Sequence, residues 1–222
     1  MKRMRVLAVA GMLALGTAGT GTAQASPAPA RTASHCPAGE VFATDNTDII
    51  TEPDDPRLTT RLARFDVEVR GIITANGARP ERSTLLDGVF WSTDLKRTTY
   101  ERSRAFDVNR VDRDGLHHIA GVIAKQYHQE SVLTFRCLPR SSPETDAVEI
   151  QARGVSATRL REALDADPQA REELGGGSVT VGGRLILIAP LADLPLARRF
   201  TAGLGVDWST AEVRYGDEEF VG

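Results

Sequence analysis

His128 is the first candidate for a catalytic residue. It begins the run His128-Gln129-Glu130-Ser131, which gathers an imidazole, an amide, a carboxylate and a hydroxyl where an expected helix meets a strand. A serine hydrolase needs a serine that a histidine reaches and a carboxylate orients. Contiguous residues seldom achieve that geometry, and no G-x-S-x-G motif surrounds Ser131. We therefore expect Glu130 and Ser131 to satisfy backbone groups of a turn, and retain His128 as a catalytic candidate.

A second candidate group lies on the expected strand 98–109. Alternate residues of a strand share one face, and one face of this strand carries Glu101, Ser103, Ala105 and Asp107. That face is either solvated, which we favour, or lines a cavity between two sheets. In the second case Glu101, Tyr100 and His128 could act on a small molecule. A haem with His128 as axial ligand is one form of this hypothesis, but no spacing requires it and we predict no cofactor.

The other histidines and the glycine runs do not indicate a metal or phosphate site. His117 and His118 are adjacent, so on a helix they point about 100° apart. A helical metal pair needs i, i+4 spacing, as in H-E-x-x-H, and we predict no metal. Glycines 175–177 and 182–183 lack the Lys-Ser/Thr of a phosphate loop. We interpret them as a helix end and a hairpin turn.

Cys36 and Cys137 are the only two cysteines. One disulfide between them is the simplest use of two cysteines in an oxidising compartment. It would close a loop of about 100 residues, for which chain entropy predicts up to about 4.7 kcal/mol of stabilisation. The alternative, a metal or redox pair, has less support because the two lack C-x-x-C spacing.

The N-terminal residues have the pattern of an export signal. Residues 1–25 combine a basic start, an apolar stretch and the cleavage motif Ala23-Gln24-Ala25, and we expect 26–35 to be a flexible leader. The apolar stretch is too short to span a bilayer, so we predict a secreted protein without a membrane anchor. Losing Lys2, Arg3 and Arg5 from the 27 basic residues leaves 24 against 30 acidic ones, a formal charge of −6. That balance disfavours nucleic acid as a partner.

Hydrophobic periodicity predicts the same order of elements in both halves of the chain. In the first half we expect strand 40–44, helix 56–76, strands 85–92 and 98–109, a helix from Asp112 or Asp114, and strand 131–137. In the second half we expect strand 147–151, a helix from Ser156 broken at Pro168, strands 178–181 and 184–189, a helix from Asp193, and strand 211–215.

These elements predict an α+β fold of two tandem ferredoxin-like units, each β-α-β-β-α-β with an antiparallel sheet. The first unit would span 36–140, a linker 141–146, and the second unit 147–222. Two such units in one chain either lie side by side or pack sheet against sheet. The architecture resembles that of the dimeric α/β-barrel proteins.

Three segments together resemble a family of short exported bacterial proteins of unknown function. They are CPAG at 36–39, YERS at 100–103 and YHQESVL at 127–133, with Cys137 following. That family has a Cys-Pro start, a Glu-x-Ser strand, a Gln-Glu-Ser/Ala-Val-Leu turn and a final cysteine. The resemblance covers 36–137 and lacks the family's aromatic-rich segment before the Glu-x-Ser strand. It implies export, a disulfide and this fold, and no activity.

The sequence leaves two classes of function open, and whether the protein is an enzyme is undecided. The leading hypothesis is a secreted, non-enzymatic binding or structural module, because no convergent catalytic motif is present. Its partner would be an unknown protein or small-molecule ligand. The alternative is a small-molecule enzyme of the dimeric α/β-barrel type, with its site between the two sheets near Tyr100, Glu101 and His128.

Overall fold

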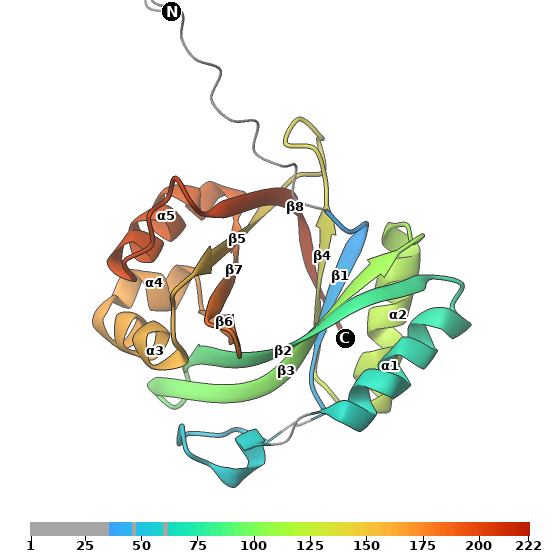
Figure 1. Ribbon diagram of the computed structural model, residues 1–222, viewed down its shortest axis with the longest axis horizontal. Coiled ribbons are helices and arrows are strands. Elements are labelled where there is room, and N and C mark those ends of the chain that lie inside the picture. The colour runs from blue at the N-terminus through green and yellow to red at the C-terminus, as the bar shows by residue number, and fades with distance from the viewer. Residues whose placement is uncertain (1–35, 46–47, 60–61) are drawn as a thin grey trace, which may run out of the picture. The chain divides into compact units, whose positions relative to one another are not determined.

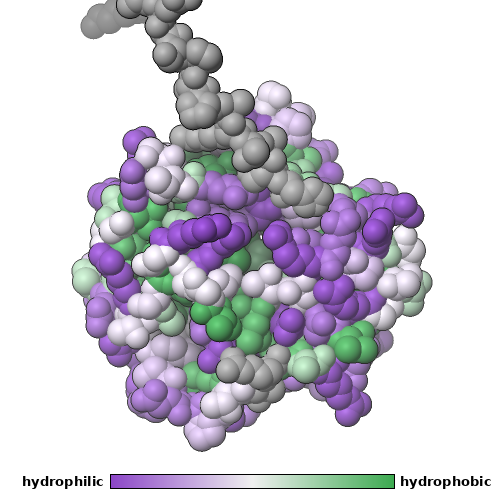
Figure 2. All heavy atoms as spheres, in the orientation of Figure 1, coloured by the Kyte–Doolittle hydropathy of each residue, from purple (hydrophilic) through white to green (hydrophobic). Residues whose placement is uncertain are grey.

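The computed structural model describes residues 36–45, 48–59 and 62–222. The expected signal peptide (1–25) and leader (26–35) lie outside these residues. Figure 1 looks at a ring of strands with helices on two opposite sides. On the face seen in Figure 2, hydrophilic side chains surround a hydrophobic area near the middle.

Eight antiparallel strands form one closed barrel. Their bounds are β1 Gly39–Ala43, β2 Arg79–Ser92, β3 Arg97–Asn109, β4 Val132–Cys137, β5 Ala147–Arg153, β6 Gly176–Thr180, β7 Arg184–Pro190 and β8 Glu212–Val221. Around the barrel they follow the order β1-β3-β2-β6-β7-β5-β8-β4, and β4 pairs with β1 to complete the ring. A closed ring leaves no strand edge with unpaired backbone groups.

The expectation of two tandem ferredoxin-like units, each with its own sheet, is wrong. Two pairings join strands of the two halves of the chain: β2 pairs with β6, and β4 pairs with β8. The expected linker 141–146 belongs to the connection from β4 to β5 within this barrel. Local sequence patterns place a strand and its buried face, but they do not say which distant strand will satisfy its free edge.

Helices cover the outside of the barrel in two groups (Figure 1). The first group is α1 (Ala63–Ala75) and α2 (Arg113–Gln126), and the second is α3 (Ala157–Ala166), α4 (Pro168–Glu173) and α5 (Leu194–Gly203). Each group buries a separate apolar cluster between itself and the strands. No described helix is long and apolar enough to cross a membrane.

Side-chain caps begin three of the described α-helices, whereas α1 and α5 begin without one. Asp112 and Ser156 accept hydrogen bonds from backbone N–H groups of α2 and α3, and Asp167 does the same for α4. The helix expected over 56–76 begins at Ala63 instead. Residues Pro56–Thr59 form a separate 3-10 turn, and Leu62 has a left-handed backbone (φ 49°) that starts the helix afresh.

Two strands are longer than expected. β2 begins at Arg79, ahead of the expected start at residue 85, and β8 continues to Val221, beyond the expected end at residue 215. The added part of β2 is polar and that of β8 is mostly polar, but both are paired to a neighbouring strand, Arg79 with Asn109 and Val221 with Val132. Backbone pairing across the barrel, not side-chain propensity, sets these ends.

The Cys36–Cys137 disulfide is present and confirms the predicted pairing. The two Cα atoms are 6.1 Å apart, and the sequence separation of the cysteines is 101. The bond ties the chain just before β1 to the end of β4, the strand that lies next to β1 in the barrel. It therefore links two neighbouring strands at the same end of the barrel.

Candidate functional site: an open cavity at one end of the barrel

The barrel interior is divided by a layer of apolar side chains. Leu86, Ala105 and Ile186 are buried there and pack with Phe42. They come from β1, β2, β3 and β7, so they meet only because the barrel is closed. A cavity lies at each end of the barrel, and Ile186 contributes to the lining of both.

The cavity bounded by the ends of β2 and β8 has a volume of about 560 Å³, and we call it the Glu101 cavity. Its lining is largely apolar and includes Phe42, Phe90, Leu133, Ile188 and Phe220. Phe90 and Phe220 are 36% and 67% exposed, which is unusual for large apolar side chains. The polar part of the lining comes from Glu101, Ser103, Gln129, Ser131, Glu173, Ser178 and Glu218.

Glu101 is the titratable group best placed to act in this cavity. It lies on β3 opposite Gly88 of β2, so no side chain faces it across that strand pair. Among the described residues it has no ion-pair or hydrogen-bond partner for its carboxyl group. Burial raises the pKa of Glu101 to about 7. A carboxyl group with this pKa can donate a hydrogen bond or a proton below neutral pH and accept one above it.

Gln129 supplies a second polar group without a partner. Its Oε1 accepts a hydrogen bond from the Thr44 backbone N–H at 3.2 Å, which fixes the orientation of the amide. Its Nε2 is buried and has no hydrogen-bond partner within the described residues. A buried donor without a partner costs about 1–3 kcal/mol, and a ligand carbonyl or hydroxyl in the cavity would remove that cost.

Two glycines make room for the aromatic wall of the cavity. A Cβ at Gly88 would lie 2.5 Å from the Phe90 ring, and a Cβ at Gly176 would lie 2.5 Å from the Val89 carbonyl oxygen. Any larger residue at either position would therefore displace Phe90 or separate β2 from β6. α4 ends at Glu173, and Gly175 follows with the left-handed backbone (φ 69°) expected of a helix terminator. Gly176 and Gly177, which were also expected to end the helix, belong to β6 instead.

Of the three predicted site residues, only Glu101 lines the cavity. Tyr100 lies on the other face of β3, where it packs against the cluster under α3 and α5, and its backbone N–H donates to the Ile50 carbonyl. His128 is exposed and takes a left-handed backbone (φ 54°) at the end of α2. This turn directs the next residue, Gln129, into the lining. The Glu101 face that we expected to be solvated lines the barrel interior instead, and Ser103 and Asp107 on it are buried.

His117 and His118 do not share a site. His117 Nε2 lies 2.8 Å from a Glu219 carboxylate oxygen, and His118 is exposed. Within the described ranges, no three histidine, cysteine, aspartate or glutamate side chains come together as metal ligands.

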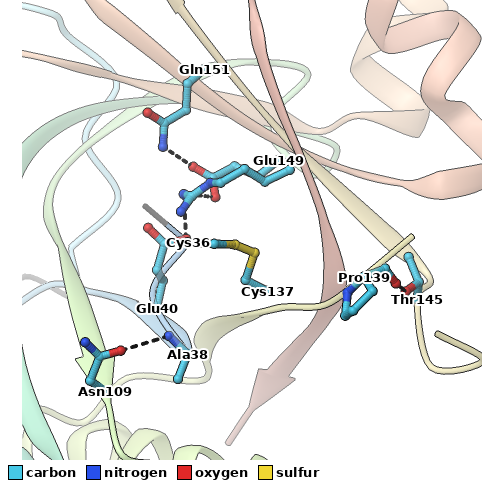
Figure 3. The surroundings of a disulfide bond; sticks show 10 residues. Cys36, Ala38, Glu40, Asn109, Cys137, Pro139, Thr145, Glu149 and Gln151 are labelled. Atoms are coloured by element: carbon cyan, nitrogen blue, oxygen red, sulfur yellow. Dashed lines mark hydrogen bonds and ion pairs between the residues drawn. A yellow bond between two sulfur atoms is a disulfide. The ribbon is translucent and has the colours of Figure 1, made fainter. Parts of the chain in front are cut away.

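A buried charged cluster lies deeper in the barrel, beside the layer of apolar side chains. Arg214 Nη2 donates to Glu40 at 2.7 Å and also to Glu149, and all three residues are buried. Burial, and then repulsion from Glu149, raises the pKa of Glu40 well above its ordinary value. Figure 3 shows Glu40, Glu149 and Gln151 in the surroundings of the disulfide. No local sequence pattern indicates this cluster, because its members lie on β1, β5 and β8.

Comparisons with known proteins add little to this geometry. No family model and no curated protein matches the chain. A solved structure described as an anthrone oxidase-like protein is similar at 13% identity, over 83% of this chain and 93% of that chain, with a TM-score of 0.24. A likeness of this size supports no argument about function.

Proposed function

We propose that the protein binds a small, mainly apolar organic molecule in the Glu101 cavity. One observation supports this most directly: an open cavity with exposed aromatic side chains at its mouth holds two polar groups, the Glu101 carboxyl and Gln129 Nε2, that no described residue satisfies. Small-molecule sites combine an apolar lining with a few polar groups in this way, and the volume lies in their usual range.

The polar groups define the ligand that would fit. Gln129 Nε2 can donate to a carbonyl or hydroxyl oxygen. Glu101 is largely neutral at mildly acidic pH because its pKa is about 7, so it can donate to a second oxygen without a buried charge. Phe42, Phe90 and Phe220 would contact rings or alkyl groups. We infer a neutral molecule with a cyclic apolar body and at least one oxygen acceptor.

We also propose that the protein works outside the cell, as the N-terminal pattern predicts. The Cys36–Cys137 disulfide and the lack of a membrane-spanning helix among the described residues are compatible with a secreted protein. The resemblance to short exported bacterial proteins stays a prediction.

The binding proposal can be tested with N-phenyl-1-naphthylamine, an uncharged probe whose fluorescence rises in apolar sites. We expect saturable, one-to-one binding to the folded protein. Ile188→Trp places a large ring in the cavity from β7 and should abolish binding. Val67→Trp adds the same ring on α1, where Val67 is 70% exposed, and should leave binding unchanged. Equal affinities for the two variants would show that the probe binds elsewhere.

A second candidate function is acid–base catalysis on the bound molecule, and the pKa of Glu101 favours it. A general base works best when its pKa lies near the operating pH. The test is deuterium incorporation at the carbon next to the carbonyl of 2-tetralone, followed by NMR in D₂O. Glu101→Gln should abolish any enhancement over buffer while N-phenyl-1-naphthylamine still binds. No enhancement by the wild-type protein would leave a binding module.

A further inference from the structure

The opposite end of the barrel has a second cavity with a different chemistry. Its volume is about 540 Å³, and we call it the arginine cavity because Arg82, Arg153 and Arg184 all line it. It lies beyond the layer of Leu86, Ala105 and Ile186, at the ends of β3 and β5. Three arginines here are notable in a chain whose formal net charge is −3.

Two of these arginines have no carboxylate partner. Arg82 Nε lies 3.0 Å from Asp107 Oδ2, so its charge is compensated. Glu40, the other acidic residue of the lining, is held by Arg214. Neither Arg153 nor Arg184 forms an ion pair within the described residues. The rest of the chain contains no aspartate or glutamate that could supply one.

The strand register makes this arrangement unfavourable without a ligand. Arg153 and Arg184 are direct partners on β5 and β7, so their side chains leave the same face at the same level. Like charges directly opposite each other on neighbouring strands destabilise a sheet. An anion between the two guanidinium groups would turn this repulsion into two attractive contacts.

Two further features orient the arginines toward the cavity. Gln151 Oε1 accepts from Arg184 Nη1 at 3.2 Å, while Gln151 Nε2 donates to Glu149 Oε1 at 2.5 Å. Arg184 is therefore connected to the buried Glu149 through the Gln151 side-chain amide. Because this contact uses one N–H group of Arg184, the remaining N–H groups are available to a ligand. Across the cavity, β2 has a bulge between Pro80 and Ser83 that contains Arg82. Bulges re-aim side chains and are common beside functional sites.

We propose that the arginine cavity is a binding site for a small organic anion that presents a carboxylate or phosphate group to Arg153 and Arg184. The guanidinium fork matches the oxygen spacing of both groups, and charge-assisted bonds of this kind are about twice as strong as neutral ones. Thr84 and Thr180 in the same lining offer hydroxyl groups to the remaining ligand oxygens. This site is independent of the Glu101 cavity.

Calorimetric titration at low ionic strength, with inorganic phosphate and with succinate as probes, tests the proposal. We expect saturable binding of at least one probe. Phosphate alone would identify a phosphate ligand, and succinate alone a carboxylate ligand. Arg153→Gln and Arg184→Gln should each weaken binding about tenfold or more, equivalent to about 1.4 kcal/mol. Arg153→Lys, which keeps the charge, should recover part of the loss.

Arg198→Gln is the matched control, because Arg198 lies on the outer helix α5, where it stacks on Trp208. It removes the same charge and should leave affinity unchanged. Without a probe, Arg153→Gln should raise the unfolding temperature slightly by relieving repulsion. N-phenyl-1-naphthylamine binding should persist in all these variants. The proposal is overturned if neither probe binds saturably, or if Arg198→Gln weakens binding as much as the two cavity variants do.

Discussion

Replacing Glu101 with glutamine should change how the stability of the protein depends on pH. Burial raises the pKa of Glu101 from 4.5 to about 7, so the folded protein holds this proton more tightly than the unfolded chain. The stability that the neutral carboxyl provides is fully present below pH 4.5. It is lost as the pH rises from there through about 7, because the native state must then carry a charge that burial disfavours.

The size of the effect follows from the two pKa values. At about 1.36 kcal/mol per pKa unit, the difference between 4.5 and about 7 corresponds to about 3 kcal/mol. Glu101 is only half-buried, and solvent at the open mouth screens part of this energy. We therefore expect about 1–3 kcal/mol. Glutamine has nearly the same shape as the protonated acid and no charge, so Glu101→Gln should be more stable than wild type by this amount at pH 8. The two proteins should have similar stability at pH 4.5.

Urea unfolding followed by circular dichroism across this pH range measures the difference directly. Glu40 and Glu218 also have raised pKa values, but their contributions are common to both proteins and cancel in the comparison. Glu130→Gln is the matched control: it removes one carboxylate at an exposed position outside the cavity lining. A stability difference between Glu101→Gln and wild type that stays constant from pH 4.5 to 8, or a less stable variant at pH 8, would refute the reasoning.

Three further predictions concern what holds the barrel together. Arg214→Met leaves Glu40 and Glu149 buried without their common partner, which should cost about 3–5 kcal/mol in urea unfolding at pH 7. This loss of stability should be smaller at pH 4–5, because the carboxyls then take up protons. It should also be smaller in the double variant with Glu149→Gln. A loss of stability that is the same in both tests would indicate a packing effect. Replacing both cysteines with serine should lower stability by about 2–4 kcal/mol, and titration of two free thiols in the denatured, unreduced wild type would contradict the disulfide. Gly176→Ala should weaken the β2–β6 pairing and lower stability in thermal unfolding, because its Cβ would lie 2.5 Å from the Val89 carbonyl oxygen. Gly71→Ala on α1 is the control: its Cβ would have no atom within 4 Å, so it should stabilise the protein by up to about 1 kcal/mol.

The candidate site was only partly visible in the sequence. The alternation of Glu101, Ser103, Ala105 and Asp107 correctly indicates that these residues share a face, and a cavity was one of the two environments considered for it. In the sequence Gln129 stands next to His128, which is the more familiar catalytic type, and no pattern there favours Gln129. The left-handed backbone at His128 leaves His128 exposed and places Gln129 in the cavity lining. A glycine would have indicated such a turn in the sequence, but none stands at this position.

Most of the local elements and the covalent link can be predicted from the amino-acid sequence. A helix cap depends on a side chain that bonds to nearby backbone, as at Asp112, Ser156 and Asp167. The disulfide depends on two side chains, and two cysteines allow a single pairing. The pairing of β2 with β6 and of β4 with β8 is seen only in the three-dimensional structure. Those contacts join backbone groups at least 79 residues apart, and backbone hydrogen bonds carry no residue code. Closure of the barrel then brought Glu40, Glu149 and Arg214 together, set Arg153 beside Arg184, and turned the Glu101 face inward.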